Sequence, residues 1–437
     1  MYLTRRFYIA FVLIILAIAS GYWYAPLFGI GKVVLWLFLV LVAADYALLY
    51  HRRGIKTMRF VPERFSNGDE NEVRLRVEST YPFPVWIDII DEIPFIFQRR
   101  DVSFKTVLRA RRERQVRYRL RPTRRGVYGF GRIRTFVSTP LGLLARRFTT
   151  GEPQDVKVYP SFLMLQRYEL LAISNRLTDM GIKKIRRIGH NTEFEQIKDY
   201  VQGDDFRTIN WKATARRHQL MTNVYQDERS QQLFCVIDKG RVMQQAFRGM
   251  TLLDYAINAS LVLSYVAIRR EDKAGLLTFD DHFDSYLPAE KQPGHLQAML
   301  ETLYAQQSTF GESDFSALAD SVNQHISKRS LLVLFTNFSG KIAMERQLPY
   351  LRQLSRHHRL LVVFFEDMDL KAYNATTAHT TEEYYQHVIG EKFAYEQRLV
   401  ASLLRQQGIL SLYTTPENLS VDVINKYLEM KTRGLVG

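Results

Sequence analysis

The sequence predicts a membrane-anchored multidomain protein, made of a two-helix transmembrane hairpin, an antiparallel β-sandwich and an α/β domain with a doubly wound sheet. Two long apolar runs open the chain. Apolar and polar residues then alternate over residues 59–148, and short apolar runs alternate with helical segments after residue 232. At 437 residues the chain is long enough for several domains. We expect them at residues 1–56, 57–150, 151–232 and 233–437, the third being a connector.

The two apolar runs predict the transmembrane hairpin. Residues 7–24 carry no charge, and residues 33–50 carry only Asp45. Each run has 18 residues, about 27 Å as an α-helix and close to the ~30 Å hydrocarbon core of a bilayer. Residues 25–32 between them contain one proline and two glycines, so a hairpin turn is expected there.

Basic residues on either side of the runs predict the orientation of this hairpin. The flanks contain Arg5, Arg6, His51, Arg52, Arg53 and Lys56, whereas the loop contains only Lys32. By the positive-inside rule, both ends and the large domains lie in the cytoplasm. The alternative, a signal peptide cleaved near residue 19, is less favoured because a second apolar run follows at once.

The β-sandwich prediction rests on period-two alternation, as in Val73, Leu75 and Val77, with frequent turn residues between the segments. This segment also carries the positive charge. Residues 99–147 contain 16 Lys and Arg against two acidic residues, which is +14 of the net +15. A solvated face, contact with anionic lipid and an acidic protein partner all stay open. Nucleic acid is disfavoured because the aromatic residues mostly occupy core positions.

The α/β prediction comes from continuous apolar runs too short for helices. They lie at residues 233–238, 274–279, 331–336, 360–365 and 409–413, with helical patterns at 252–269, 382–407 and 418–431. Continuously apolar strands that alternate with helices indicate a parallel sheet covered on both faces. Cys235, the single cysteine, lies in the first run and is expected to be buried. It excludes an intramolecular disulfide and a cysteine-based metal site.

The stretch over residues 189–228 is the most informative part of the chain. Its pattern is G-x-x-x-E-F-x-x-I-x-x-Y-x-x-G-D-D-x-R-x-I-N-W-x-A-x-A-R. It resembles the domain of unknown function 58, a family of bacterial proteins related to von Willebrand factor A domains and encoded beside MoxR-type AAA+ ATPases. The residues that carry the resemblance are Glu193, Tyr200, Gly203, Asp204, Asp205, Arg207, Asn210, Trp211 and Arg216. So many acids and bases predict an internal lattice of ion pairs, with Trp211 as its apolar anchor, or else a docking surface.

The resemblance implies a von Willebrand A-like fold for residues 233–437. In that fold a divalent cation is held at the carboxyl ends of the strands by D-x-S-x-S, a threonine and an aspartate. Here Asp238 is present, but Gly240, Ser313 and Asn337 stand where a serine, the threonine and the aspartate are expected. We therefore expect a degenerate site that binds no metal, with an Arg241–Asp238 ion pair in place of the cation, and no cofactor. The acid and histidine cluster at residues 280–284 is expected to be a solvated hairpin tip.

No phosphate-binding glycine loop and no H-E-x-x-H or G-x-S-x-G pattern is found in the sequence. We therefore expect a non-enzymatic scaffold or adaptor in the bacterial inner membrane. The resemblance implies a MoxR-type AAA+ ATPase as its partner and leaves room for other von Willebrand A-like proteins. The lipid bilayer is a further partner, and nucleic acid is not. The alternatives are a Mg²⁺-dependent protein-binding domain and, more weakly, a hydrolase.

Overall fold

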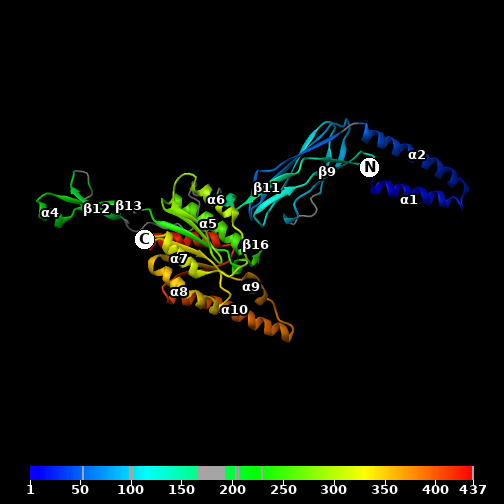
Figure 1. The fold of residues 1–437 in the computed structure, drawn as a ribbon. Coiled ribbons are helices and arrows are strands. Elements are labelled where there is room, and N and C mark those ends of the chain that lie inside the picture. Colours follow the sequence, from blue (N-terminus) through cyan, green and yellow to red (C-terminus); the bar gives the residue numbers. More distant parts are fainter. Residues whose placement is uncertain are drawn as a thin grey trace. The chain divides into compact units, whose positions relative to one another are not determined.

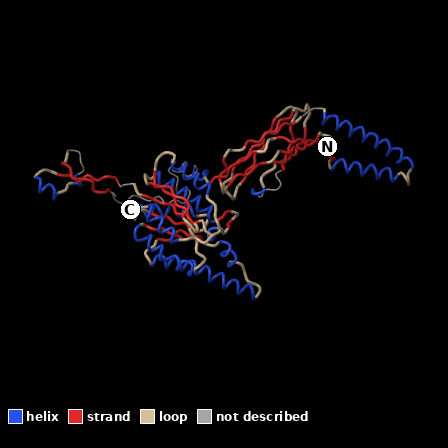
Figure 2. The backbone as a smooth tube through the Cα atoms, in the orientation of Figure 1, coloured by secondary structure: helices blue, strands red, loops and turns tan. Residues whose placement is uncertain are grey.

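The computed structural model describes residues 1–51, 54–97, 103–165, 192–201, 204, 206–227 and 230–435. The chain forms two compact units, Met1–Ser161 and Phe162–Gly437. Figures 1 and 2 show that two helices and a group of strands make up the first unit, and that a sheet with helices dominates the second.

The first unit begins with a helical hairpin formed by α1 (Arg5–Ser20) and α2 (Ala25–Tyr50). The turn expected at residues 25–32 is wrong, because these residues form the first turns of α2 and the connection is residues 21–24. Proline is accepted in the first turn of a helix, where its missing N–H would have had no partner. Gly31 belongs to the helix packing: a Cβ there would lie 2.7 Å from the Ile18 side chain, so glycine permits the close approach of α1.

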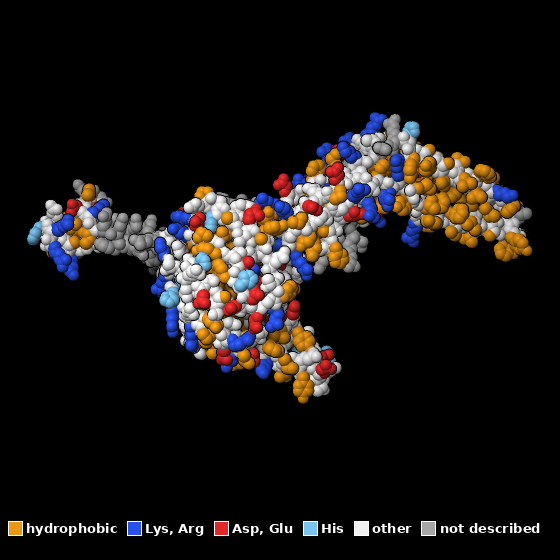
Figure 3. Space-filling view, viewed as in Figure 1, with side chains coloured by type: hydrophobic (Ala, Val, Ile, Leu, Met, Phe, Trp, Pro, Cys, Tyr) orange, Lys and Arg blue, Asp and Glu red, His pale blue; other side chains and the backbone are white. Residues whose placement is uncertain are grey.

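The surface of this hairpin is apolar. Trp36 is 71% exposed and Leu13 is 61% exposed, and Figure 3 shows hydrophobic side chains covering the helices. By length and composition alone, two described helices could cross a membrane: Pro26–Tyr50 and Leu252–Arg269. The second is 72% buried within the protein as a core helix. With 16 residues, α1 is shorter than either, about 24 Å long.

Strands of three sheets follow. One has the order β1 (Tyr2–Leu3), β10 (Leu144–Thr150), β9 (Ile133–Ser138), β5 (Val85–Asp91) and β6 (Ser103–Leu108). The second contains β2 (Ile55–Phe60), β4 (Asn71–Ser79) and β7 (Glu113–Leu120), and the third β3 (Arg64–Ser66), β11 (Gln154–Tyr159) and β8 (Gly126–Phe130). The pairs are antiparallel except β3 with β11, which is parallel. Because β11 pairs with β8, the sandwich extends into the range expected to be a connector.

The predicted alternation is confirmed in β4, where Val73, Leu75 and Val77 are fully buried and the residues between them are not. These side chains belong to one hydrophobic core to which all three sheets contribute. The side chains of β2 and β9 also meet directly, through a hydrogen bond of 3.1 Å between the hydroxyls of Thr57 and Thr135. The sheets therefore pack face to face, as the sequence predicts.

The last turns of α2 are part of this sandwich. Asp45 is fully buried and accepts hydrogen bonds from the Thr139 hydroxyl, from Leu143 N–H (3.1 Å) and from Leu144 N–H (2.8 Å). One turn later, the Leu49 side chain joins the sandwich core. The charge that interrupts the second apolar run is thus a structural link between helix and sheet.

The second unit contains a six-stranded sheet in the order β18 (Phe283–Glu290), β17 (Lys273–Phe279), β14 (Gln232–Asp238), β19 (Leu331–Phe335), β20 (Arg359–Phe365) and β21 (Leu410–Thr414). Neighbouring strands are parallel except β17 and β18. The predicted parallel sheet is therefore a mixed sheet with one antiparallel edge strand. Two short strands, β15 (Ala246–Phe247) and β16 (Met250–Thr251), form a separate ribbon.

Helices cover both faces of this sheet. Side chains of α7 (Phe315–His325), α8 (Lys341–His357) and α10 (Thr381–Gln406) form one core with alternate strand residues such as Phe234 and Val236. Cys235 points the other way: its sulfur lies 3.6 Å from the Ser264 hydroxyl of α5 (Leu252–Arg269). The helices α6 (His295–Ala305) and α11 (Leu419–Thr432) contact α5, and α9 (Met368–Asn374) contacts α10. Cys235 is fully buried as predicted, and burial raises the pKa of its thiol to about 12.

Candidate functional site

Asp238 is the last residue of β14, at the carboxyl edge of the sheet, and its side chain is fully buried. One carboxylate oxygen, Oδ1, accepts hydrogen bonds from the Ser313 hydroxyl (2.5 Å) and the Gly240 N–H (2.8 Å). The other, Oδ2, accepts one from the Thr336 hydroxyl (2.6 Å). Burial raises the pKa of this carboxyl, and these hydrogen bonds oppose the rise. The carboxylate is thus held by neutral donors of the protein itself.

The position of Gly240 explains why the serine of a D-x-S-x-S pattern is missing here. A Cβ at this position would lie 2.0 Å from the Ser313 hydroxyl oxygen and 3.1 Å from Asp238 Oδ1. The Ser313 hydroxyl therefore occupies the space that a serine at 240 would need. Asn337 is half-buried, and its side-chain oxygen accepts a hydrogen bond from the Phe338 N–H (3.0 Å). The sequence patterns did not single out Thr336 as a partner of Asp238, although its place at the end of an apolar strand is a usable signal.

The expected Arg241–Asp238 ion pair is wrong, since no such pair occurs among the described residues. The Arg241 side chain is exposed, and its backbone N–H donates to the Gly311 carbonyl (2.8 Å). Asp238 has no need of this cation because two hydroxyls and an amide already satisfy it. The neighbouring Lys239 is buried, and its ammonium group lies 2.9 Å from Asp284.

A small pocket of about 70 Å³ opens beside Asp238. Its lining includes Ser313 and Asn337 from the predicted remnant site, together with Glu312 and Arg346, which form an ion pair of 3.0 Å. A water molecule takes about 30 Å³ of liquid volume. The pocket therefore has room for a few water molecules or a single ion.

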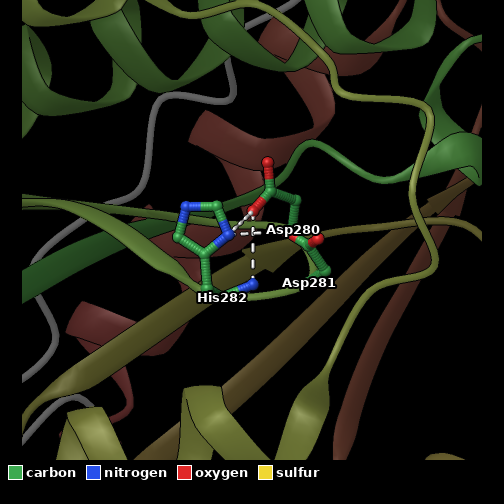
Figure 4. A group of neighbouring side chains, drawn as sticks. All are labelled: Asp280, Asp281 and His282. Carbon is green, nitrogen blue, oxygen red and sulfur yellow. Dashed lines mark hydrogen bonds and ion pairs between the residues drawn. The ribbon is translucent and has the colours of Figure 1, made fainter.

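Asp280, Asp281 and His282 form a second cluster, at the turn between β17 and β18 (Figure 4). The hairpin is confirmed, but the solvated tip is wrong for Asp280, whose side chain is only 1% exposed and lies 3.5 Å from the Lys239 ammonium group. The ring nitrogen Nδ1 of His282 lies 2.6 Å from Asp281 and 3.2 Å from Asp280.

Ion pairs link the side chains of this cluster, which are also close enough to hold a cation. The hydrogen bond to Asp281 and the charge of Asp280 raise the pKa of His282. A cation here would therefore compete with a proton on His282 and with the ammonium group of Lys239 at Asp280.

We expect no stoichiometric Mg²⁺ or Mn²⁺ binding by the purified protein, and an unchanged unfolding temperature in excess chelator. The reason is that Ser313, Gly240 and Thr336 already use three of the roughly four acceptor positions of the Asp238 carboxylate, which leaves little room for a cation. Isothermal titration calorimetry checks this. A tight 1:1 isotherm that Asp238→Ala abolishes would contradict the expectation. An isotherm lost instead in Asp281→Ala would place the ion at the second cluster.

The stretch at residues 192–227 forms a separate β-hairpin. Its strands are β12 (Thr192–Asp199) and β13 (Met221–Asp227), joined through a 3₁₀ turn, η3 (Phe206–Thr208), and a short helix, α4 (Trp211–Arg217). Asn210 caps α4 by accepting a hydrogen bond from the Ala213 N–H (3.0 Å), and its amide donates to Asn223 (2.8 Å). The Thr214 hydroxyl accepts from the Met221 N–H (3.0 Å). Neutral hydrogen bonds therefore hold α4 against the hairpin.

The expected burial of the tryptophan is wrong, whereas the expected ion-pair lattice includes Glu193 and Asp205, whose side chains lie outside the described part of the structure. Trp211 is 68% exposed, and the side chains of Arg207 and Arg216 are also exposed. Asp204 pairs with Lys198 (3.1 Å), and its pKa is lowered by the Val201 N–H and by this lysine. Tyr200 is half-buried. Gly203, Asp205 and the side chain of Glu193 lie outside the described residues.

Residues 196–373 match the family described as "Protein of unknown function DUF58". The chain carries a DUF58 region. This region contains both the β12–β13 hairpin from residue 196 onward and the carboxyl-edge residues Asp238, Ser313 and Asn337. The resemblance in the residue pattern is thereby confirmed at the level of the family.

The chain is also similar to "Uncharacterized protein YeaD" of Bacillus subtilis (strain 168), with 24% identity over 269 residues. The match spans 60% of this chain and 64% of the relative, less than two thirds of its length. Among solved structures, the pilus adhesin SpaC of Lactobacillus rhamnosus GG is 10% identical at a TM-score of 0.29, over 48% of this chain and 31% of that one. The CARDB domain of the PF1109 protein of Pyrococcus furiosus is 13% identical at a TM-score of 0.19, over 24% of this chain and 93% of that one. These TM-scores are too low to carry a functional comparison.

Proposed function

We propose that this chain is a non-enzymatic, membrane-anchored scaffold or adaptor whose α/β domain is von Willebrand A-like. The observation that supports this most is the hydrogen bonding of Asp238 at the carboxyl edge of the sheet, where ligands of open α/β sheets bind. Its two carboxylate oxygens accept from Ser313, Gly240 and Thr336, so the polar groups of this edge interact with one another. The strand order, with one antiparallel edge strand and helices on both faces, agrees with the proposed fold.

The anchor is the α1–α2 hairpin, and the location is the bacterial inner membrane with the large domains in the cytoplasm. Support comes from the apolar surface of the two helices and from the basic residues that flank the hairpin on the side opposite its connecting turn. The buried position of Asp45 adds to it, because a carboxylate bonded inside the sandwich imposes no cost on an apolar span.

Cysteine labelling tests this topology. We expect Trp23→Cys, in the exposed turn between α1 and α2, to react with an impermeant maleimide in intact cells. Glu152→Cys, exposed at the far end of the sandwich, should react only after lysis. The native thiol gives no background because Cys235 is fully buried. Labelling of Glu152→Cys in intact cells would contradict the cytoplasmic placement.

The partner implied by the family resemblance is a MoxR-type AAA+ ATPase, which would supply nucleotide hydrolysis. We expect the full chain to co-purify with such an ATPase from gently solubilised membranes, and the purified chain to have no hydrolase activity of its own. A non-hydrolysable nucleotide should hold the ATPase in its assembled state and increase recovery. The adaptor proposal fails if an ATPase encoded beside this chain never co-purifies in either nucleotide state.

A further inference from the structure

The exposed end of the β12–β13 hairpin, residues 197–220, combines two kinds of side chain that soluble surfaces rarely display together. Five large apolar residues are exposed there: Ile197 by 39%, Val201 by 62%, Phe206 by 70%, Trp211 by 68% and Leu220 by 46%. We call the described residues of this end, 197–201, 204 and 206–220, the hairpin tip. It contains η3 and α4, and α4 is labelled in Figure 1.

The three cations of the short helix α4 have no counter-ion within the described part of the chain. Lys212, Arg216 and Arg217 are exposed on α4, and none of them forms an ion pair within the described part of the chain. Of the two acidic residues described in the hairpin tip, Asp204 is paired with Lys198, and Asp199 is exposed on β12. Three positive charges on one short helix therefore stand beside an exposed indole, and their complement must be anionic.

The fold holds this combination in place. The Asn210 cap and the Thr214–Met221 hydrogen bond fix α4 on the hairpin through neutral groups. A further hydrogen bond of 2.7 Å joins the hydroxyls of Thr208 and Thr222. Because these contacts are neutral, they do not use the charges of Lys212, Arg216 and Arg217, which stay available to a ligand.

We propose that the hairpin tip contacts an anionic membrane surface. This inference rests on the proposed membrane anchor. Tryptophan and other aromatic rings prefer the headgroup region of a bilayer, where each Lys or Arg is also attracted to anionic lipid. The apolar residues are spread over a loop, a turn and a helix. A protein groove that binds a helix contacts anchor residues at regular helical spacing. The irregular spread seen here therefore suits a lipid surface better.

Because the chain is anchored by its helical hairpin, even a weak contact is sufficient for the hairpin tip to bind lipid. A chain whose hairpin is inserted keeps the tip at a high effective concentration of lipid, so a few side chains bind without new recognition elements. The contact is electrostatic in part, and it should weaken as the Debye length falls with added salt.

The test uses the full chain in nanodiscs of phosphatidylcholine alone or mixed equally with phosphatidylglycerol. Gln219→Cys, exposed in the tip, carries an environment-sensitive fluorophore, and buried Cys235 stays unlabelled. We expect a blue shift and several-fold less quenching by iodide in the anionic discs, both reversed by high salt. A fluorophore at Glu345→Cys, exposed on α8, should not respond.

Variants identify the groups responsible. Arg216→Gln with Arg217→Gln should abolish the shift, whereas Arg352→Gln with Arg356→Gln, which removes the same charge from exposed sites on α8, should keep it. Trp211→Ala should melt like the parent, because its side chain is exposed, and yet lose most of the shift.

The outcomes are separable. If the chain does not co-elute with the discs, the membrane anchor itself fails. If it co-elutes and the tip fluorophore reports the same environment in both lipids, the hairpin-tip inference alone is overturned. It is also overturned if poly-glutamate produces the shift in uncharged discs while anionic lipid does not, since the ligand is then an acidic polypeptide.

Discussion

Asp91→Ala is expected to destabilise the β-sandwich by about 3–5 kcal/mol, because it leaves a buried guanidinium without its partner. The side chains of Arg59 and Asp91 are 3% and 0% exposed and form a two-point ion pair. Asp91 also accepts a hydrogen bond from the Tyr118 hydroxyl (2.5 Å), and Arg59 donates to the Gly131 carbonyl (2.9 Å). Urea unfolding of the detergent-solubilised chain, followed by circular dichroism, measures the loss.

Two variants control this prediction. Glu70→Ala removes one partner of an exposed ion pair with Arg119, and exposed pairs contribute only about 0–1 kcal/mol. The double replacement Arg59→Met with Asp91→Leu removes both buried charges and should recover much of the loss. Equal unfolding midpoints for Asp91→Ala and Glu70→Ala would show that the buried pair does not hold the sandwich.

Asp45→Ala is expected to cost roughly 2–6 kcal/mol, because it leaves two buried donors unsatisfied at about 1–3 kcal/mol each, together with one part-buried donor. These donors are the Thr139 hydroxyl and the N–H groups of Leu143 and Leu144. The loss should appear as earlier unfolding of the sandwich and as protease cleavage between α2 and β2. Asp155→Ala, at an exposed aspartate of β11, is the matched control and should change neither measurement. Protease resistance equal to that of the parent chain would contradict the role assigned to Asp45.

The spacing of the hydrophobic residues along the sequence predicted most of the fold. Strict alternation in β4 and continuous apolar runs such as β14 and β20 are imposed by burial on one or both faces of a sheet, and burial can be read along the chain. The antiparallel edge strand β18 was harder, because its residues are only partly buried and carry a weaker pattern. The parallel pairing of β3 with β11 joins residues about 90 positions apart, which local pattern cannot reveal.

The site was less predictable because its geometry depends on distant partners. Asp280 and Asp281 are adjacent in sequence, yet one faces buried Lys239 and the other faces solvent. Composition around Trp211 suggested a buried indole among ion pairs, whereas neutral groups of Asn210 and Thr214 hold the helix and leave the ring outside. Composition alone cannot tell a charged lattice that is satisfied internally from a charged surface.

Because the end of α2 is packed into the sandwich, no flexible connection separates the helix from the β-domain. Asp45 accepts a hydrogen bond from Leu144 N–H, and the Leu49 side chain lies in the sandwich core. The end of α2 and the β-sheets are therefore held together as one body. In the proposed membrane arrangement, a change in helix tilt then turns the sandwich by the same angle. Because helices tilt to match the thickness of the bilayer, the orientation of the sandwich would report how thick the surrounding membrane is.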